Sequence, residues 1–89
     1  MDTQKYKARE DAISQEIGSE TVILDLNGSS YFGLDDVATN IWQLIHEPVT
    51  IDEVTDALTN IYEVDREVLK TDVEKFMNDM LAAGLAESL

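Results

Sequence analysis

Few side chains in this chain could carry out enzyme chemistry. It contains one histidine, His46, and no cysteine, so it offers no thiolate nucleophile and no cysteine-based metal site. His46 lies two residues before Pro48, where we expect a helix to end and the imidazole to cap carbonyls or face water. The carboxylates are numerous, but none has the spacing of a paired general acid and base. We therefore expect a protein that is not an enzyme and that uses no metal and no cofactor.

Backbone groups offer a different chemistry in the segment Ser30-Tyr31-Phe32-Gly33-Leu34. This segment is predicted to be a short strand, with Phe32 and Leu34 on one face and Tyr31 and Gly33 on the other. It contains no lysine, proline or other charge that would block strand pairing. An open strand edge presents unpaired N–H and C=O groups, and an extended peptide can add to it as a further strand.

Two earlier runs, residues 12–17 and 21–26, are also predicted to be strands. The second of them is expected to turn three side chains toward the core: Val22, Leu24 and Leu26. Asn27-Gly28 is a strong hairpin signal between the second run and the 30–34 strand, since both residues tolerate positive φ. Strands joined by tight turns form an antiparallel meander, and the 30–34 strand then lies at its edge.

Three helices are predicted after the sheet. Asp35 is the expected N-cap of the first, and Thr50 with Glu53 forms a capping box for the second. Asp65 caps the third, which is expected to stop at Gly84. The predicted fold is therefore α+β, with a three-stranded antiparallel sheet followed by three helices in an arrangement like a winged helix-turn-helix.

The apolar faces of the last two helices predict the core. The second helix is expected to bury Ile51, Val54, Ala57, Leu58 and Ile61, with Tyr62 beside them. The third carries a wide stripe of Leu69, Val73, Phe76, Met77, Met80 and Leu81. Ordinary core packing explains this stripe, but one of its edges could also line a groove, because methionine adapts to varied guests. The two interpretations are compatible.

Composition limits the partners that this protein can have. The 89 residues predict one domain over residues 11–89, preceded by a flexible tail over residues 1–10. No apolar run reaches the roughly 18–20 residues of a membrane span and no signal peptide is recognisable, so we expect a cytoplasmic protein. The net charge of −13 repels nucleic acid and anionic membranes, and would attract a basic peptide.

DNA binding is the alternative that the helix pair suggests. A recognition helix needs Lys or Arg to contact phosphates. Residues 50–85 contain nine acidic residues against three basic ones, Arg66, Lys70 and Lys75. This charge disfavours a winged-helix regulator of transcription, which we keep as the alternative from another functional class.

Several segments together resemble the PqqD-like proteins. The run YFGLDDVATNIW, residues 31–42, resembles their strand-to-helix junction, and the runs at 49–54, 72–77 and 83–85 resemble later parts of the same family. These proteins are the small peptide-recognition domains, or RiPP recognition elements, of ribosomal peptide natural-product pathways. The stand-alone leader-binding protein of lasso-peptide biosynthesis is the most similar version. The resemblance extends over about residues 12–85.

The resemblance implies that the leader of a precursor peptide binds as an added antiparallel strand, between the third strand and the third helix. Carried onto this sequence, it implies nine peptide-binding residues: Ser30, Tyr31, Phe32, Gly33, Leu34, Asp72, Phe76, Asp79 and Met80. Phe76 and Met80 would accept an apolar leader side chain, and the two aspartates would pair with a basic one. On the helix, Lys75 or Met77 fits the periodicity nearly as well.

The resemblance also implies a protein partner. In the lasso subfamily the domain delivers its leader to a separate leader peptidase, so the expected function is that of a non-catalytic peptide chaperone. An alternative within the family is a chaperone that presents a peptide to a radical enzyme or another modifying enzyme.

Overall fold

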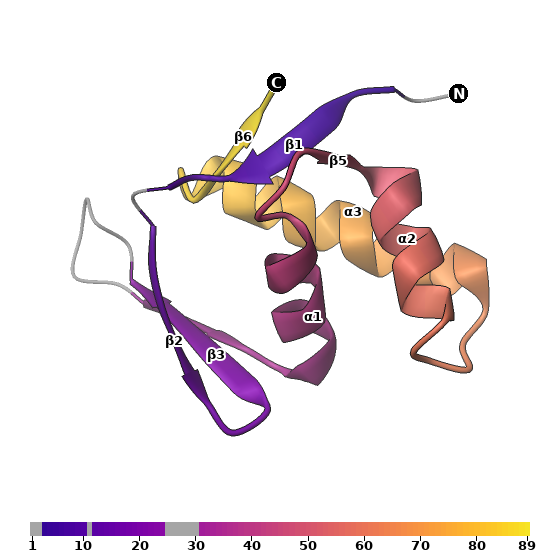
Figure 1. Ribbon diagram of the computed structural model, residues 1–89, viewed down its shortest axis with the longest axis horizontal. Helices are drawn as coiled ribbons and strands as arrows, with labels where there is room; N and C mark the ends of the chain where they lie inside the picture. The colour runs from indigo at the N-terminus through magenta and orange to yellow at the C-terminus, as the bar shows by residue number, and fades with distance from the viewer. Residues whose placement is uncertain (1–2, 11, 25–30) are drawn as a thin grey trace.

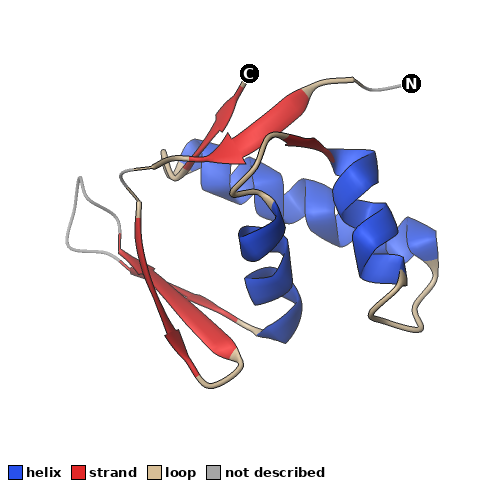
Figure 2. Cartoon of the chain, in the orientation of Figure 1, coloured by secondary structure: helices blue, strands red, loops and turns tan. Residues whose placement is uncertain are grey.

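The computed structural model describes residues 3–10, 12–24 and 31–89 (Figure 1). These residues form β1 (Lys5–Ala8), β2 (Ile13–Ile17), β3 (Glu20–Leu24), β4 (Tyr31–Leu34), α1 (Asp36–Leu44), β5 (Val49–Thr50), α2 (Ile51–Thr59), α3 (Arg66–Ala82) and β6 (Ala86–Ser88). The strands make two antiparallel sheets, and the helices lie between and beside them (Figure 2). The predicted α+β class, with antiparallel strands and three helices among the described residues, is confirmed.

The first of these sheets has the strand order β2–β3–β4, so β4 lies at one edge of it. In its register Thr21 pairs with Leu34 and Ile23 pairs with Phe32. Paired residues share a face of the sheet, so the packing of Leu34 against the core also turns Thr21 and Ile23 inward. Both are buried, whereas Leu24 is 48% exposed.

This register corrects the predicted inner face of the second strand. Val22 and Leu24, expected to point inward, lie on the face opposite Thr21 and Ile23. The prediction was wrong because it chose the more apolar of two alternating sets, and here the outer face of the sheet is itself apolar. Leu26 and the Asn27-Gly28 turn lie outside the described residues.

The second sheet was not predicted. It has the order β5–β1–β6, with the N-terminal strand in the middle, and its register pairs Tyr6 with both Val49 and Ser88. The flexible tail predicted over residues 1–10 is therefore wrong for β1. The backbone N–H of Ala8 also donates to the carbonyl of Ile45 at 2.7 Å, which ties this strand to the end of α1.

Side-chain caps begin each helix where the sequence predicts. The Asp35 carboxylate accepts from a first-turn backbone amide of α1 at 2.9 Å. Thr50 and Glu53 form the reciprocal capping box of α2, with contacts of 3.1 Å and 2.9 Å. Asp65 accepts from the backbone amide of Glu67 at 3.1 Å and caps α3. Each cap satisfies an amide that has no partner inside its helix, which fixes the start of the helix.

Gly84 lies just after the end of α3, where the sequence predicts the stop. Gly84 has φ of 75°, a left-handed conformation that favours glycine. Its N–H donates to the carbonyl of Leu81 at 3.2 Å, and the N–H of Leu85 donates to that of Met80 at 2.9 Å. This pair of bonds is the Schellman arrangement, and it turns the chain so that Leu85 is buried and β6 can pair with β1.

The hydrophobic core lies between the three helices and the inner face of the β2–β3–β4 sheet, and strands β1 and β6 of the second sheet also contribute to it. Its buried apolar residues are Ala8, Ile23, Leu34, Ile41, Trp42, Ile45, Ile51, Val54, Leu58, Leu69, Val73, Phe76, Met77, Met80, Leu85 and Ala86. Ile61, predicted to be buried, is 55% exposed, because α2 ends at Thr59 and Ile61 no longer follows its apolar face.

Candidate functional site

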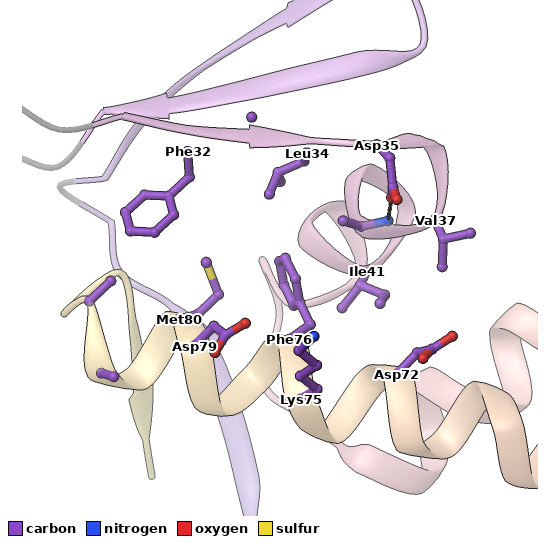
Figure 3. Close-up of a pocket in the computed structure, with 14 residues that line it drawn as sticks. Phe32, Leu34, Asp35, Val37, Ile41, Asp72, Lys75, Phe76, Asp79 and Met80 are labelled. Atoms are coloured by element: carbon purple, nitrogen blue, oxygen red, sulfur yellow. Dashed lines mark hydrogen bonds between the residues drawn. The ribbon is translucent and has the colours of Figure 1, made fainter.

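A groove of about 830 Å³ separates β4 and α1 from α3 (Figure 3). Its lining residues are Phe32, Gly33, Leu34, Asp35, Val37, Ala38, Ile41, Asp72, Lys75, Phe76, Asp79, Met80, Ala82 and Ala83. One wall is thus the edge strand with the helix that follows it, and the other wall is the long helix near the end of the chain.

The strand wall offers backbone hydrogen-bonding groups. Among the described strands only β3 pairs with β4, so the second side of β4 has no strand partner. Gly33 lines the groove, and a Cβ added there would meet no atom within 4 Å. The face of β4 on which a Gly33 side chain would stand is therefore open. An edge with these properties can accept a further strand.

The floor of the groove is apolar. Phe32 and Leu34 project from β4 on the face that packs on the core, and Ile41 joins them from α1. Phe76 and Met80 project from α3 and belong to the core as well as to the groove. The stripe on α3 therefore has both of the roles that the sequence left open, and an apolar side chain entering here would leave water on contact with aromatic and thioether groups.

The rim of the groove is charged along α3. Asp72, Lys75 and Asp79 lie on the exposed side of the helix, and among the described residues no ion pair or hydrogen bond is found for the side chain of any of them. Asp35 adds a third carboxylate, which already accepts a hydrogen bond from the backbone N–H of Ala38 in the first turn of α1. The lining thus holds three acidic groups against one basic group, and it favours a cationic side chain at the rim.

The structure brings together most of the residues that the resemblance implies. Those that line the groove are Phe32, Gly33, Leu34, Asp72, Phe76, Asp79 and Met80. Ser30 lies outside the described residues. Of the two alternatives on the helix, Lys75 lines the groove, whereas Met77 is 1% exposed and belongs to the core alone. That these residues contact a peptide stays a prediction.

Tyr31 lies elsewhere. Its side chain is 69% exposed and points to the outer face of the sheet, as strand alternation predicts. There it borders a smaller hollow of about 290 Å³ together with Ile13, Val22 and Leu24. Tyr31 can therefore serve the groove through its backbone only.

The contribution of α1 to the groove was missed. Val37, Ala38 and Ile41 line the groove together with Asp35, although none of them was predicted to belong to the site. The available signal was the immediate succession of strand and helix across Asp35, which places the first turns of α1 beside the edge strand. Ala82 and Ala83 at the end of α3 were missed as well, and their small apolar side chains gave no distinguishing signal.

Charged groups hold the third helix on the second. Arg66 contacts Asp56 at 3.0 Å and Asp52 at 3.4 Å, and Lys70 contacts Asp52 at 3.4 Å. Hydrogen bonds from Lys70 and Arg66 lower the pKa of the Asp52 carboxyl below its ordinary value. These contacts join α3 to α2, and none of the four residues lines the groove.

Within the described ranges, none of the helices has the length and apolar character that crossing a bilayer requires. In the same part of the chain, no three or more His, Cys, Asp or Glu side chains gather in a way that could hold a metal ion.

The sequence profile of one protein family, described as coenzyme PQQ synthesis protein D (PqqD), matches residues 20–86. The chain belongs to the PqqD family. The match begins at β3 and ends in β6, so it includes both walls of the groove. It confirms the family that the segments at 31–42, 49–54, 72–77 and 83–85 suggested.

Two solved structures have the same fold as this PqqD-family chain. TbiB1 in complex with the TbiA(beta) leader peptide is 34% identical in sequence, with a TM-score of 0.81 over 91% of this chain and 94% of TbiB1. A lasso peptide synthetase B1 complexed with the leader peptide is 24% identical, with a TM-score of 0.79 over 92% of this chain and 96% of that protein. No sequence among curated proteins matches the chain.

Proposed function

We propose that this protein binds the leader region of a ribosomally made precursor peptide and presents it to a maturation enzyme, without being an enzyme itself. The observation that carries the proposal is the open edge of β4, which faces α3 across an apolar groove. The similarity to TbiB1, whose solved structure contains the TbiA(beta) leader peptide, supports it.

The leader adds to β4 as an extended antiparallel strand. Its main chain pairs with the free side of the strand, and each hydrogen bond contributes about 1 kcal/mol net. A four-residue edge makes few such bonds, so they barely offset the cost of ordering a flexible peptide. The remaining affinity comes from alternate side chains of the leader, which enter the groove between Leu34 on one wall and Phe76 and Met80 on the other.

Charge selects and attracts the peptide. The net charge of −13 draws a basic segment toward the protein, and this attraction weakens as salt is added. At the groove, Asp72 and Asp79 provide carboxylates without a partner among the described residues. A leader with an apolar side chain for the floor and a basic one for the α3 rim fits this arrangement.

The benefit to the pathway is proximity. A leader held on this protein, which in turn contacts the enzyme, raises the effective concentration of the precursor at the active site. We propose the lasso-peptide leader peptidase as that enzyme and the cytoplasm, where the precursor is synthesised, as the compartment. A radical enzyme is the alternative partner within the family.

Titration tests the binding. A fluorescein-labelled synthetic leader, taken from the precursor peptide encoded beside this gene, should bind with a Kd of about 1 µM or tighter. A scrambled peptide of the same composition and charge should bind at least about tenfold more weakly. Equal binding of the two peptides, or no binding below about 1 mM, would contradict the proposal.

N-methylation of the leader tests the mode of binding without altering the protein. One backbone amide at a time is methylated along the bound segment. Because successive amides of a strand point to opposite sides, strand addition predicts that every second methylation weakens binding strongly and that those between have little effect. A uniform profile would exclude strand addition.

A further inference from the structure

Tyr62, in the connection between α2 and α3, is hydrogen-bonded to the first turns of α1. Its hydroxyl donates to Oδ2 of Asp36 at 2.6 Å and accepts from Nδ2 of Asn40 at 2.7 Å. The same Nδ2 also lies 3.2 Å from the backbone carbonyl oxygen of Asp36. The bond to Asp36 raises the pKa of the Tyr62 hydroxyl, so it keeps its proton and remains a donor.

These contacts leave the groove itself untouched. Asp36 and Asn40 are four residues apart and share one side of α1. Val37, Ala38 and Ile41 line the groove, whereas Tyr62, Asp36 and Asn40 do not. The helix therefore carries a groove wall on one side and the Tyr62 contact on another.

The placement of α1 decides how far apart the two walls stand. The β2–β3–β4 sheet packs on the helical part of the molecule through α1, while α3 packs mainly on α2 and β6 (Figure 1). Besides the bond from Thr39 to the carbonyl of Leu34 at the adjoining end of β4, side chains of α1 make hydrogen bonds to segments distant in sequence at two places among the described residues. Gln43 donates to Glu16 of β2 at 2.7 Å, and Asp36 and Asn40 bind Tyr62. The first contact joins α1 to the sheet, and the second joins it to the unit that contains α3.

We propose that Tyr62 is a positioning residue for the peptide groove, because its hydroxyl fixes the first turns of α1, and with them the Val37–Ile41 wall, relative to α3. This inference rests on the proposed function of the groove. Without the hydroxyl the core still forms, since Ile41, Trp42 and Ile45 anchor the rest of α1. Some of the molecules then adopt conformations in which the groove has a different width. The apparent affinity falls in proportion to the fraction of molecules in the binding-competent conformation.

Tyr62→Phe removes the hydroxyl alone, and Tyr6→Phe is the matched control. Tyr6 lies in β1, outside the groove, and no hydrogen bond of its hydroxyl is found among the described residues. With the fluorescein-labelled leader, Tyr62→Phe should raise the Kd about five- to tenfold, whereas Tyr6→Phe should leave it within about twofold. Both variants should stay folded.

A second readout separates positioning from a general loss of stability. In the absence of peptide, Tyr62→Phe should shift the backbone amide NMR signals of α1 and of the facing part of α3 more than those of the β5–β1–β6 sheet. Asp36→Ala, which removes the acceptor, should reproduce the weaker binding, and Asp36→Asn, which keeps an acceptor oxygen, should recover most of it. A double-mutant cycle between Tyr62→Phe and Asp36→Ala should show that the two losses are not additive.

The outcomes distinguish this inference from the proposed function. If the unaltered protein binds the leader and a folded Tyr62→Phe variant binds equally well, the positioning role is excluded and the proposed function stands. The same conclusion follows from Asp36→Ala if Tyr62→Phe fails to fold. If the unaltered protein does not bind the leader, the proposed function fails and this inference fails with it.

Discussion

Phe32 of β4 and Met80 of α3 point toward each other across the groove (Figure 3). Met80 is 2% exposed and belongs to the core, whereas Phe32 is only partly buried. An apolar side chain that enters between them contacts both walls at once. This pair therefore joins an edge strand that offers hydrogen bonds to a helix that offers apolar surface.

Phe32→Ala should weaken leader binding by about tenfold or more, because it removes the aromatic surface of the strand wall while leaving the strand backbone in place. The loss of stability should be small by comparison, since Phe32 is only partly buried. Fluorescence anisotropy gives the affinity and urea unfolding gives the stability.

Ile17→Ala is the control for this variant. Ile17 lies in β2, at the opposite edge of the same sheet, and is 61% exposed. Its truncation should leave the affinity within about twofold. If Ile17→Ala weakened binding as much as Phe32→Ala, the guest would occupy a different surface from the one described here.

Neutralising the α3 rim should change the salt dependence of binding. The double substitution Asp72→Asn with Asp79→Asn should weaken the binding of a leader with a basic residue by about 1 kcal/mol or less per carboxylate. The difference should shrink as ionic strength rises from about 50 mM to 300 mM, because salt screens exposed charges. Lys75→Ala should instead strengthen the binding of the same leader, because it removes the positive charge from the rim. A loss that is independent of salt would indicate a packing effect in place of an electrostatic one.

Gly84→Ala should destabilise the fold by about 1 kcal/mol, because a left-handed conformation is unfavourable for a residue with a Cβ. Gly33→Ala provides the comparison. An added Cβ meets no atom within 4 Å at either position, but only Gly84, with φ of 75°, has a positive φ. Gly33→Ala should therefore leave the free energy of unfolding within about 0.5 kcal/mol of its original value. Equal effects in thermal unfolding would refute this assignment of the end of α3.

Acid should weaken the α2–α3 contact through Asp52. Its folded-state pKa is lowered from the ordinary value of 3.8 by hydrogen bonds from Lys70 and Arg66. The stability that the Asp52 contacts contribute is therefore fully present above pH 3.8, and it is lost as the pH falls through the lower folded-state pKa. Between about pH 5 and pH 2.5 the Tm of Asp52→Asn should fall less than that of the unaltered protein. For Asp79→Asn, at a carboxylate without a described ion pair, the Tm should fall as much as that of the unaltered protein. If the Tm of the unaltered protein and of both variants fell equally, Asp52 would not be the source of the acid sensitivity.

Local signals predicted the parts of the fold that local interactions form. Caps at Asp35, Thr50 and Asp65 and the stop at Gly84 each act within a few residues, so the sequence displays them directly. The open edge of β4 followed from the same kind of reasoning, because β4 comes last in the meander, whereas the position of α3 opposite that edge was implied only by the resemblance to the PqqD-like proteins.

Pairing between distant segments could not be predicted in this way. In the β5–β1–β6 sheet, β1 pairs with a two-residue strand and a three-residue strand from far along the chain, and none of the three has a strong alternating pattern. Which face of β3 points to the core could not be predicted from the sequence either. Thr21 is buried there because its partner Leu34 is buried, a relationship that exists only once the register is formed.

The most direct test of strand addition is an NMR measurement of which protein protons lie next to the bound leader. With isotope-labelled protein and unlabelled leader, filtered NOE spectra should show contacts from the leader backbone to that of Gly33, and from its side chains to Phe76 and Met80. Contacts confined to Ile13 and Leu24 on the outer face of the sheet, or to the β5–β1–β6 sheet, would contradict the account.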